Sequence, residues 1–98
     1  MFEIIIDHVA PYLENLSKPE AIAVGEAINR LEREGNKLRM PLSKPLGHGL
    51  FELRPSRQRI IYFYWNGKVI LTNGFKKETG KTPPQEIRQA LNVKKLYK

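Results

Sequence analysis

The sequence predicts a small α+β domain in which helices cover a mostly antiparallel sheet. Three observations predict this fold class. The chain has 98 residues, enough for one domain. Its first third predicts a strand and two helices, and its second half predicts three short strands and a helix. The connections between those three strands are too short for parallel crossovers, so the strands should form an antiparallel meander. We therefore expect a single domain over residues 1–98.

The first third of the chain should contain a strand, a short helix and a longer helix. The run from Phe2 to Ile6 is apolar and β-branched, which is typical of a strand. A helix beginning near residue 10 should follow, because Pro11 is tolerated only in a first turn. Its apolar residues recur at helical spacing and are Val9, Tyr12, Leu13 and Leu16.

The longer helix carries a signal at each end. Ser17 and Glu20 have the spacing of a capping box at its start. Gly35 suits the left-handed conformation in which helices often end. The buried stripe of this helix should comprise Ala21, Val24, Ile28 and Leu31.

After the longer helix come residues 36–49, which have no clean period and contain several Pro and Gly residues. We expect a loop there whose inward-facing residues are Leu38, Leu42 and Leu46. Strands should follow over residues 50–54, 59–65 and 68–75, with Asn66-Gly67 as a two-residue hairpin turn. The last helix should begin at Thr82-Pro83-Pro84-Gln85, with Thr82 as its cap. Its inner face should be Ile87, Ala90 and Leu91.

The two N-terminal helices should cover one face of the sheet and leave the other face open. Alternation along residues 59–65 places Tyr62 and Tyr64 on one side, where we expect core packing. Phe63 and Trp65 take the other side and offer a surface on which RNA bases could stack. Both sides of this strand are apolar, so the pattern alone leaves open which of them is exposed.

The composition excludes several classes of protein. The chain has no cysteine, which excludes disulfides and thiolate metal sites and favours a reducing cytoplasm. No apolar run approaches the roughly 20 residues that span a membrane, so no membrane partner is expected. The apolar run at the N-terminus is too short for a signal peptide and lacks a basic start.

Charge is distributed unevenly along the chain. Residues 1–35 contain three basic and seven acidic residues, a net charge of −4. Residues 36–98 contain fourteen basic residues and only three acidic ones, a net charge of +11. Such segregation favours a polyanionic partner over charge that serves solubility alone, and nucleic acid is the leading candidate.

Four ordered motifs lie in this basic segment. Their members are Gly49-Leu50-Phe51-Glu52-Leu53-Arg54, Arg59-Ile60-Ile61-Tyr62-Phe63, Asn73-Gly74-Phe75-Lys76-Lys77 and Lys81-Thr82-Pro83 with Glu86-Ile87. Together they resemble the phage-derived, HigB-like branch of the RelE/ParE toxin superfamily, and with the N-terminal elements they match its βααβββ layout.

The resemblance implies a toxin of a toxin–antitoxin pair that cuts messenger RNA on the translating ribosome. Its partners would be mRNA, the 70S ribosome and a cognate antitoxin, often of the helix-turn-helix type. The cleavage it implies needs neither cofactor nor metal. It requires an aligned substrate, neutralised phosphate charge and proton transfer at two oxygens.

Arg54 and Arg59 are the predicted catalytic arginines, because the planar guanidinium suits a phosphate transition state. They lie on adjacent predicted strands joined by a tight connection, so they should lie close together. By resemblance, Arg59 matches an arginine that binds phosphate in RelE-type toxins, and Arg54 matches the basic residue of the preceding strand. In the alternative interpretation, Arg54 pairs with Glu52 on a solvated face.

Four further cations complete the predicted site. By resemblance, the segment that holds Lys76 and Lys77 contains active-site cations, and we predict Lys77 as catalytic. Lys76, Lys81 and Arg57 are predicted to bind RNA. One of Lys76 and Lys77 should face the cleft and the other should face solvent. The alternative is that they are ordinary exposed surface lysines.

No residue of the sequence is a clear general base. His48 has a suitable intrinsic pKa but lies in a glycine-flanked loop, and His8 lies near the N-terminal helix. RelE carries lysines around the position of Glu52, and these are missing here. Tyr97 could correspond to the tyrosine of some RelE-type toxins, but it lies in no matching motif.

Two other functions therefore stay open. A ParE-like inhibitor of DNA gyrase would have nearly the same fold and no enzymatic activity. An inactive RNA-binding module would show salt-dependent RNA binding without cleavage.

Overall fold

The structure is a computed structural model that describes residues 2–78 and 80–98. The elements in chain order are β1 (Glu3–Ile5), α1 (Ala10–Glu14), α2 (Lys18–Glu34), a short 3-10 helix η1 (Gly35–Lys37), β2 (Ser43–Gly47), β3 (Leu50–Leu53), β4 (Gln58–Trp65), β5 (Lys68–Lys76) and α3 (Pro84–Lys94). The predicted α+β class is confirmed, as are the three predicted strands of the second half.

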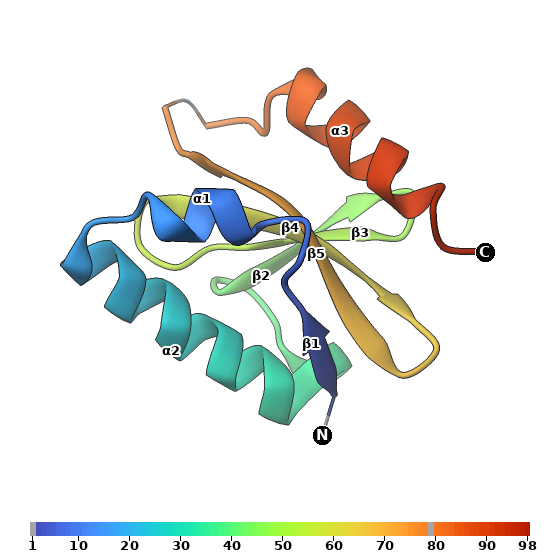
Figure 1. Ribbon diagram of the computed structural model, residues 1–98, viewed down its shortest axis with the longest axis horizontal. Helices are drawn as coiled ribbons and strands as arrows, with labels where there is room; N and C mark the ends of the chain where they lie inside the picture. The colour runs from blue at the N-terminus through green and yellow to red at the C-terminus, as the bar shows by residue number, and fades with distance from the viewer. Residues whose placement is uncertain (1, 79) are drawn as a thin grey trace.

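One five-stranded sheet in the order β1-β5-β4-β3-β2 forms the centre of the protein (Figure 1). Strands β2 to β5 form an antiparallel meander, and β1 pairs in parallel with β5 at one edge. The meander requires only short connections, whereas the parallel β1 reaches β5 through the long crossover that contains the other elements.

Strand β2 lies within the segment predicted to be a loop, and that prediction is wrong. Ser43–Gly47 forms the edge of the sheet and pairs only with β3. Pro45 and Gly47 are both untypical of a strand, but an edge strand tolerates proline because one side of its backbone needs no partner. The predicted burial within this segment holds for Leu38, which is 6% exposed, and partly for Leu42 and Leu46.

Both faces of the sheet are covered, which corrects the predicted open face. Helices α1 and α2 lie on one face and α3 lies on the other (Figure 1). The core beneath α1 and α2 includes Leu31, Leu53 and Tyr62, and the smaller core beneath α3 includes Ile61 and Ala90. The amphipathic α3 buries its apolar stripe there, because a three-turn helix gains most of its stability from such packing.

The predicted ends of α2 are confirmed. The Glu20 side chain accepts the Ser17 backbone N–H at 2.8 Å, and the Ser17 hydroxyl accepts the Glu20 N–H at 3.4 Å. Gly35 follows the helix with a φ of 52°, and a Cβ atom there would overlap the Phe2 ring. The predicted burial holds for Val24 and Leu31 and partly for Ile28, whereas Ala21 is exposed and Ala27 is buried in addition.

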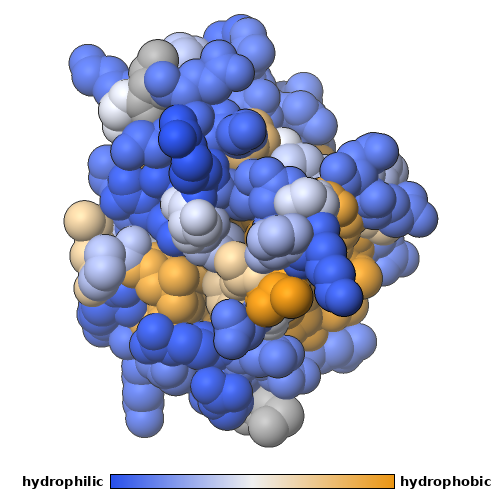
Figure 2. All heavy atoms as spheres, turned by 90° about the vertical axis from the view of Figure 1, so that its left-hand side faces the viewer, coloured by the Kyte–Doolittle hydropathy of each residue, from blue (hydrophilic) through white to orange (hydrophobic). Residues whose placement is uncertain are grey.

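Within the described residues, no helix has both the length and the apolar character needed to cross a membrane. Figure 2 shows the side of the molecule that lies on the left of Figure 1. Its upper part, where the segment between β5 and α3 lies in Figure 1, is mainly hydrophilic, and hydrophobic side chains gather lower down.

Candidate functional site

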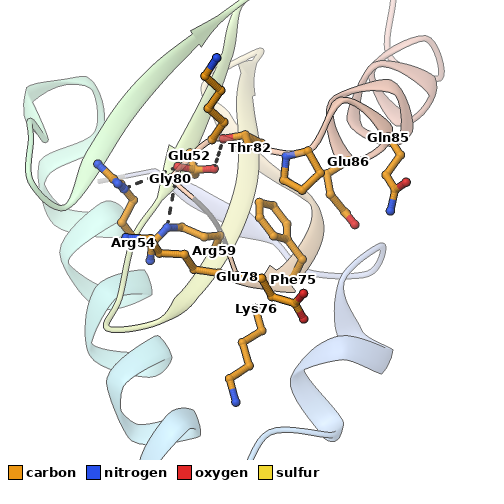
Figure 3. Close-up of a pocket in the computed structure, with 13 residues that line it drawn as sticks. Glu52, Arg54, Arg59, Phe75, Lys76, Glu78, Gly80, Thr82, Gln85 and Glu86 are labelled. Atoms are coloured by element: carbon orange, nitrogen blue, oxygen red, sulfur yellow. Dashed lines mark hydrogen bonds and ion pairs between the residues drawn. The ribbon is translucent and has the colours of Figure 1, made fainter.

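A cleft of about 320 Å³ lies where the ends of β3, β4 and β5 meet the segment leading into α3 (Figure 3). Its lining is polar and mixed in charge. The residues that line it are Glu52, Arg54, Arg59, Phe75, Lys76, Lys77, Glu78, Gly80, Lys81, Thr82, Pro83, Gln85 and Glu86. All residues of the predicted site except Arg57 are thus brought together in one place.

Glu52 lies at the floor of the cleft between the two predicted catalytic arginines (Figure 3). Its Oε1 is 3.6 Å from Arg54 Nε and 3.9 Å from Arg59 Nε. Its Oε2 accepts the Thr82 hydroxyl at 2.6 Å. The predicted proximity of the two arginines is confirmed. The alternative pairing of Arg54 with Glu52 is also present, but Glu52 is buried and does not lie on a solvated face.

Arg59 is far more buried than an RNA-binding arginine was expected to be, at 6% exposed. Its Nη1 donates to the carbonyls of Ser56 and Gln58 at 2.9 and 2.8 Å, which fixes the side chain at the start of β4. Burial lowers the pKa of Arg59, and the neighbouring Arg54 lowers it further. The Glu52 carboxylate and Tyr12 act in the opposite direction and raise this pKa, so Glu52 offsets part of the cost of burying the guanidinium.

Tyr12 supports the same end of the sheet from the opposite face. Its hydroxyl donates to Gln58 Oε1, and lies 3.3 Å from the Phe75 carbonyl. Burial raises the pKa of Tyr12 to about 12, and nearby Glu20 adds to this effect. A Cβ atom at Gly74 would overlap the Tyr12 ring, so glycine before Phe75 allows α1 to pack closely on β5.

The three predicted lysines Lys76, Lys77 and Lys81 all line the cleft, and all three are exposed. Figure 3 shows the Lys76 side chain pointing away from the two arginines. Lys77 also lines a neighbouring groove with Arg57 and Arg59. The backbone N–H of Lys77 donates to the Arg57 carbonyl at 2.8 Å, which joins the groove to the cleft. Both lysines of the pair line the cleft, and Lys76 extends away from its two arginines.

The cleft also contains residues that the sequence did not identify. Glu52, Glu78 and Glu86 all line it, and they are the only three acidic residues in residues 36–98. That scarcity was the available signal, because acids retained in a strongly basic segment are candidates for a specific role. Phe75 lies beside them and offers an aromatic face next to the cations.

Glu86 is held in place by a buried partner. Asn73 is 4% exposed, and its Nδ2 donates to Glu86 Oε1 at 2.9 Å and to the Glu86 carbonyl at 3.1 Å. A shift in the pairing of β4 with β5 occurs beside Asn73, between Ile61 and Tyr62. Such irregularities redirect side chains, and here Asn73 joins β5 to the first turn of α3.

The predicted role of Thr82 as a helix cap is wrong. Helix α3 begins at Pro84 with Pro83 as its N-cap, and no side-chain cap is present. Thr82 lies one residue before the N-cap, and its hydroxyl donates to Glu52 at 2.6 Å instead.

The far end of the α3-covered face is closed by aromatic rings. Phe63 is 1% exposed, so the predicted stacking surface is not available there. Tyr97 packs on Phe63 and Trp65 with ring centroids 5.5 and 5.2 Å apart, and its hydroxyl lies 2.7 Å from His8 Nε2. Neither Tyr97 nor His8 lines the cleft.

Tyr64 and His48 lie outside the cleft as well. Tyr64 is partly buried in the core beneath α1 and α2, as predicted together with Tyr62. His48 lies in the turn between β2 and β3, where its carbonyl accepts the Lys94 ammonium at 2.6 Å. Within residues 2–78 and 80–98, no group of three or more His, Asp or Glu side chains could hold a metal ion.

Comparison with known proteins identifies the family. Residues 11–95 match the family described as "Phage derived protein Gp49-like (DUF891)". The chain belongs to this family. This family match confirms the resemblance to the phage-derived branch of the RelE/HigB-type toxins of toxin–antitoxin systems.

One solved structure supports the fold independently. The chain is similar to a chain in the crystal structure of the toxin–antitoxin complex RelBE2 from Mycobacterium tuberculosis. The TM-score is 0.61 at 22% sequence identity, over 78% of this chain and 98% of that chain. No curated protein sequence matches the chain. The Gp49-like protein therefore has a RelE-type fold, and the cleft lies at one end of its sheet.

Proposed function

We propose that this Gp49-like protein is the toxin of a toxin–antitoxin pair and cleaves messenger RNA on the translating ribosome. The observation that carries the proposal is the convergence of Arg54 and Arg59 at the floor of a cleft rimmed by lysines. Two planar cations at one point suit a phosphate that gains negative charge during reaction.

The reaction proposed for this cleft is attack by an RNA 2′-hydroxyl on the adjacent phosphorus. The 2′-oxygen loses its proton and forms a bond to phosphorus, and the bond from phosphorus to the 5′-oxygen breaks. The products are a 2′,3′-cyclic phosphate end and a 5′-hydroxyl end, so no other reactant is consumed. Arg54 and Arg59 would neutralise the extra charge on the phosphate, and Lys77 would protonate the departing 5′-oxygen.

Glu86 is the proposed acceptor of the 2′-hydroxyl proton. Its carboxylate lines the cleft, and Asn73 fixes only Oε1. Glu52 cannot take this role, because it is 3% exposed and both of its oxygens already have partners. Replacing Glu86 by Gln should reduce single-turnover cleavage by roughly 10²-fold or more and remove the acidic limb of its pH profile. An unchanged rate would exclude Glu86 as the base.

The remaining predicted cations would position the RNA. Lys76 and Lys81 lie at the rim of the cleft, and Arg57 lies in the adjoining groove with Lys77. Exposed cations of this kind hold the phosphate backbone without sequence preference, and their contribution weakens as salt rises.

A cognate antitoxin is the second proposed partner. The RelBE2 neighbour was solved as a complex of toxin and antitoxin. We expect the antitoxin of this protein to place an acidic or amphipathic segment on its basic surface, and to be of the helix-turn-helix type. Coexpression with the product of the adjacent gene should restore growth and yield a complex that copurifies.

The decisive experiment is expression of the toxin alone in a bacterial host, followed by mapping of transcript ends. We expect growth arrest and cleaved mRNA whose new 5′ ends carry hydroxyl groups. With purified ribosomes, a transcript carrying one 2′-deoxynucleotide at the mapped position should resist cleavage there. Growth arrest with intact mRNA and lost DNA supercoiling would instead indicate a gyrase inhibitor. Harmless expression with salt-dependent RNA binding would indicate an inactive binding module.

A further inference from the structure

Glu52 is a buried charged residue of the cleft that the proposed chemistry does not use. It is 3% exposed and lies between the two arginines that should bind RNA. A carboxylate at this point repels a polyanion, and its burial costs free energy unless its partners compensate. Its placement therefore needs a physical explanation.

The distances show how Glu52 acts on the arginines. Arg54 Nε and Arg59 Nε are 3.6 and 3.9 Å from the same carboxylate oxygen, beyond the usual hydrogen-bond range of about 2.7–3.2 Å. Glu52 thus attracts both guanidinium groups by charge without taking a short hydrogen bond from either. Arg54 Nε is buried and, among the described residues, has no hydrogen-bond partner. Glu52 thus holds both guanidinium groups close to its Oε1 atom, and the Arg54 Nε–H makes no hydrogen bond to the described residues.

The cluster formed by Glu52, Arg54 and Arg59 carries a small net positive charge. Two arginines and one carboxylate carry a net charge of +1. A phosphodiester carries one negative charge, whereas a phosphomonoester carries about 1.5 to 2 at neutral pH. One bound phosphodiester would therefore neutralise the cluster, whereas a monoester would leave excess negative charge beside a buried carboxylate.

We propose that Glu52 is a positioning and specificity residue of this site. It gathers Arg54 and Arg59, and it sets the charge of the cluster so that a singly charged phosphodiester binds in preference to a doubly charged monoester. Thr82 contributes by holding Oε2 at 2.6 Å, which orients the carboxylate. This inference rests on the proposed function, because it takes the cleft to be a site for RNA phosphates.

Two ligands that differ by one methyl group and one charge test the proposal. They are a 2′-deoxynucleoside 3′-methylphosphate and the corresponding 3′-monophosphate, titrated at pH 7.5 while the Nε–H NMR signals of Arg54 and Arg59 are followed. The wild type should bind the methyl diester at least as tightly as the monophosphate. Glu52→Gln should shift the ratio of the two affinities toward the monophosphate by roughly tenfold or more.

Two control variants separate charge from other effects. Glu78→Gln removes a cleft carboxylate that is exposed and forms no ion pair with the described residues. It should change the affinity ratio by less than roughly threefold, because solvent screens its charge. Thr82→Val keeps the charge of Glu52 and removes the hydrogen bond that orients it, so it should shift the ratio in the same direction as Glu52→Gln but by a smaller factor.

The outcomes distinguish this inference from the proposed function. A folded Glu52→Gln variant with the wild-type affinity ratio would overturn the inference, while binding of both ligands at the arginines would leave the proposed function intact. Failure of the wild type to bind either ligand would overturn both. If Glu52→Gln does not fold, the wild type decides the matter. A preference of more than roughly tenfold for the monophosphate would then contradict the proposal, and a preference for the diester would support it.

Discussion

The two ends of the α3-covered face of the sheet differ sharply, although the same strands build both. At one end, which we call the closed end, Phe63 and Trp65 pack against Tyr97. At the other, the open end, Arg54, Arg59 and Phe75 line the cleft. Strand β4 contributes to both, with Arg59 near its start and Trp65 at its last position. One strand can therefore supply a rigid core and a charged site, because every second residue along a strand lies on the same face.

The closed end should control stability. Phe63→Ala removes a ring that is 1% exposed, and it should lower the free energy of unfolding by about 3–5 kcal/mol. Urea unfolding followed by tryptophan fluorescence measures this loss. A loss below about 1 kcal/mol would mean that the closed end is not a packed core.

Tyr12 should stabilise the open end from the opposite face of the sheet. Tyr12→Phe removes the hydroxyl that bonds to Gln58 and Phe75, and it should cost about 1 kcal/mol at pH 8. The folded-state pKa of Tyr12 is raised to about 12, from about 10 in the unfolded chain. Between these two pH values the unfolded wild type releases a proton that the folded wild type retains, so the wild type loses stability.

Phenylalanine has no such proton. The difference in stability between wild type and Tyr12→Phe should therefore shrink from pH 10 to pH 12 and vanish or change sign. Urea titrations at pH 8, 10 and 11 provide the comparison. A difference that stays constant with pH would contradict the raised pKa.

Tyr97 should have the smallest effect on cleavage. Its hydroxyl bonds to His8 at the closed end, and it does not line the cleft. Tyr97→Phe should leave the cleavage rate within roughly threefold of wild type, because the ring packing is retained. A loss of more than tenfold in a variant of unchanged stability would instead place this tyrosine in the chemistry.

Much of the fold could be predicted from local patterns. The capping box at Ser17 and the turn at Asn66-Gly67 depend on neighbouring residues alone, and both are present. Strand β2 could not be predicted in this way, because Pro45 and Gly47 are acceptable only at an edge. The covering of the second face by α3 is likewise a tertiary feature that no local period reveals.

The sequence predicted which of these residues lie near one another better than it predicted their surroundings. The motifs predicted that Arg54, Arg59 and the lysines lie near one another, and these residues line one cleft. The burial of Arg59 and its ion pair with Glu52 result from contacts between strands, which sequence spacing does not show. Thr82 illustrates the same limit, since its local context indicated a cap and its partner is a residue thirty positions earlier.

Single-turnover cleavage of ribosome-bound mRNA by wild type and Arg59→Lys tests the role of the open end most directly. Lysine keeps the positive charge but loses the planar fork. We predict a rate lower by roughly 10²-fold at saturating toxin, with the variant shown to be folded at the assay temperature. Equal rates for the two folded proteins would contradict the assignment of phosphate binding to Arg59.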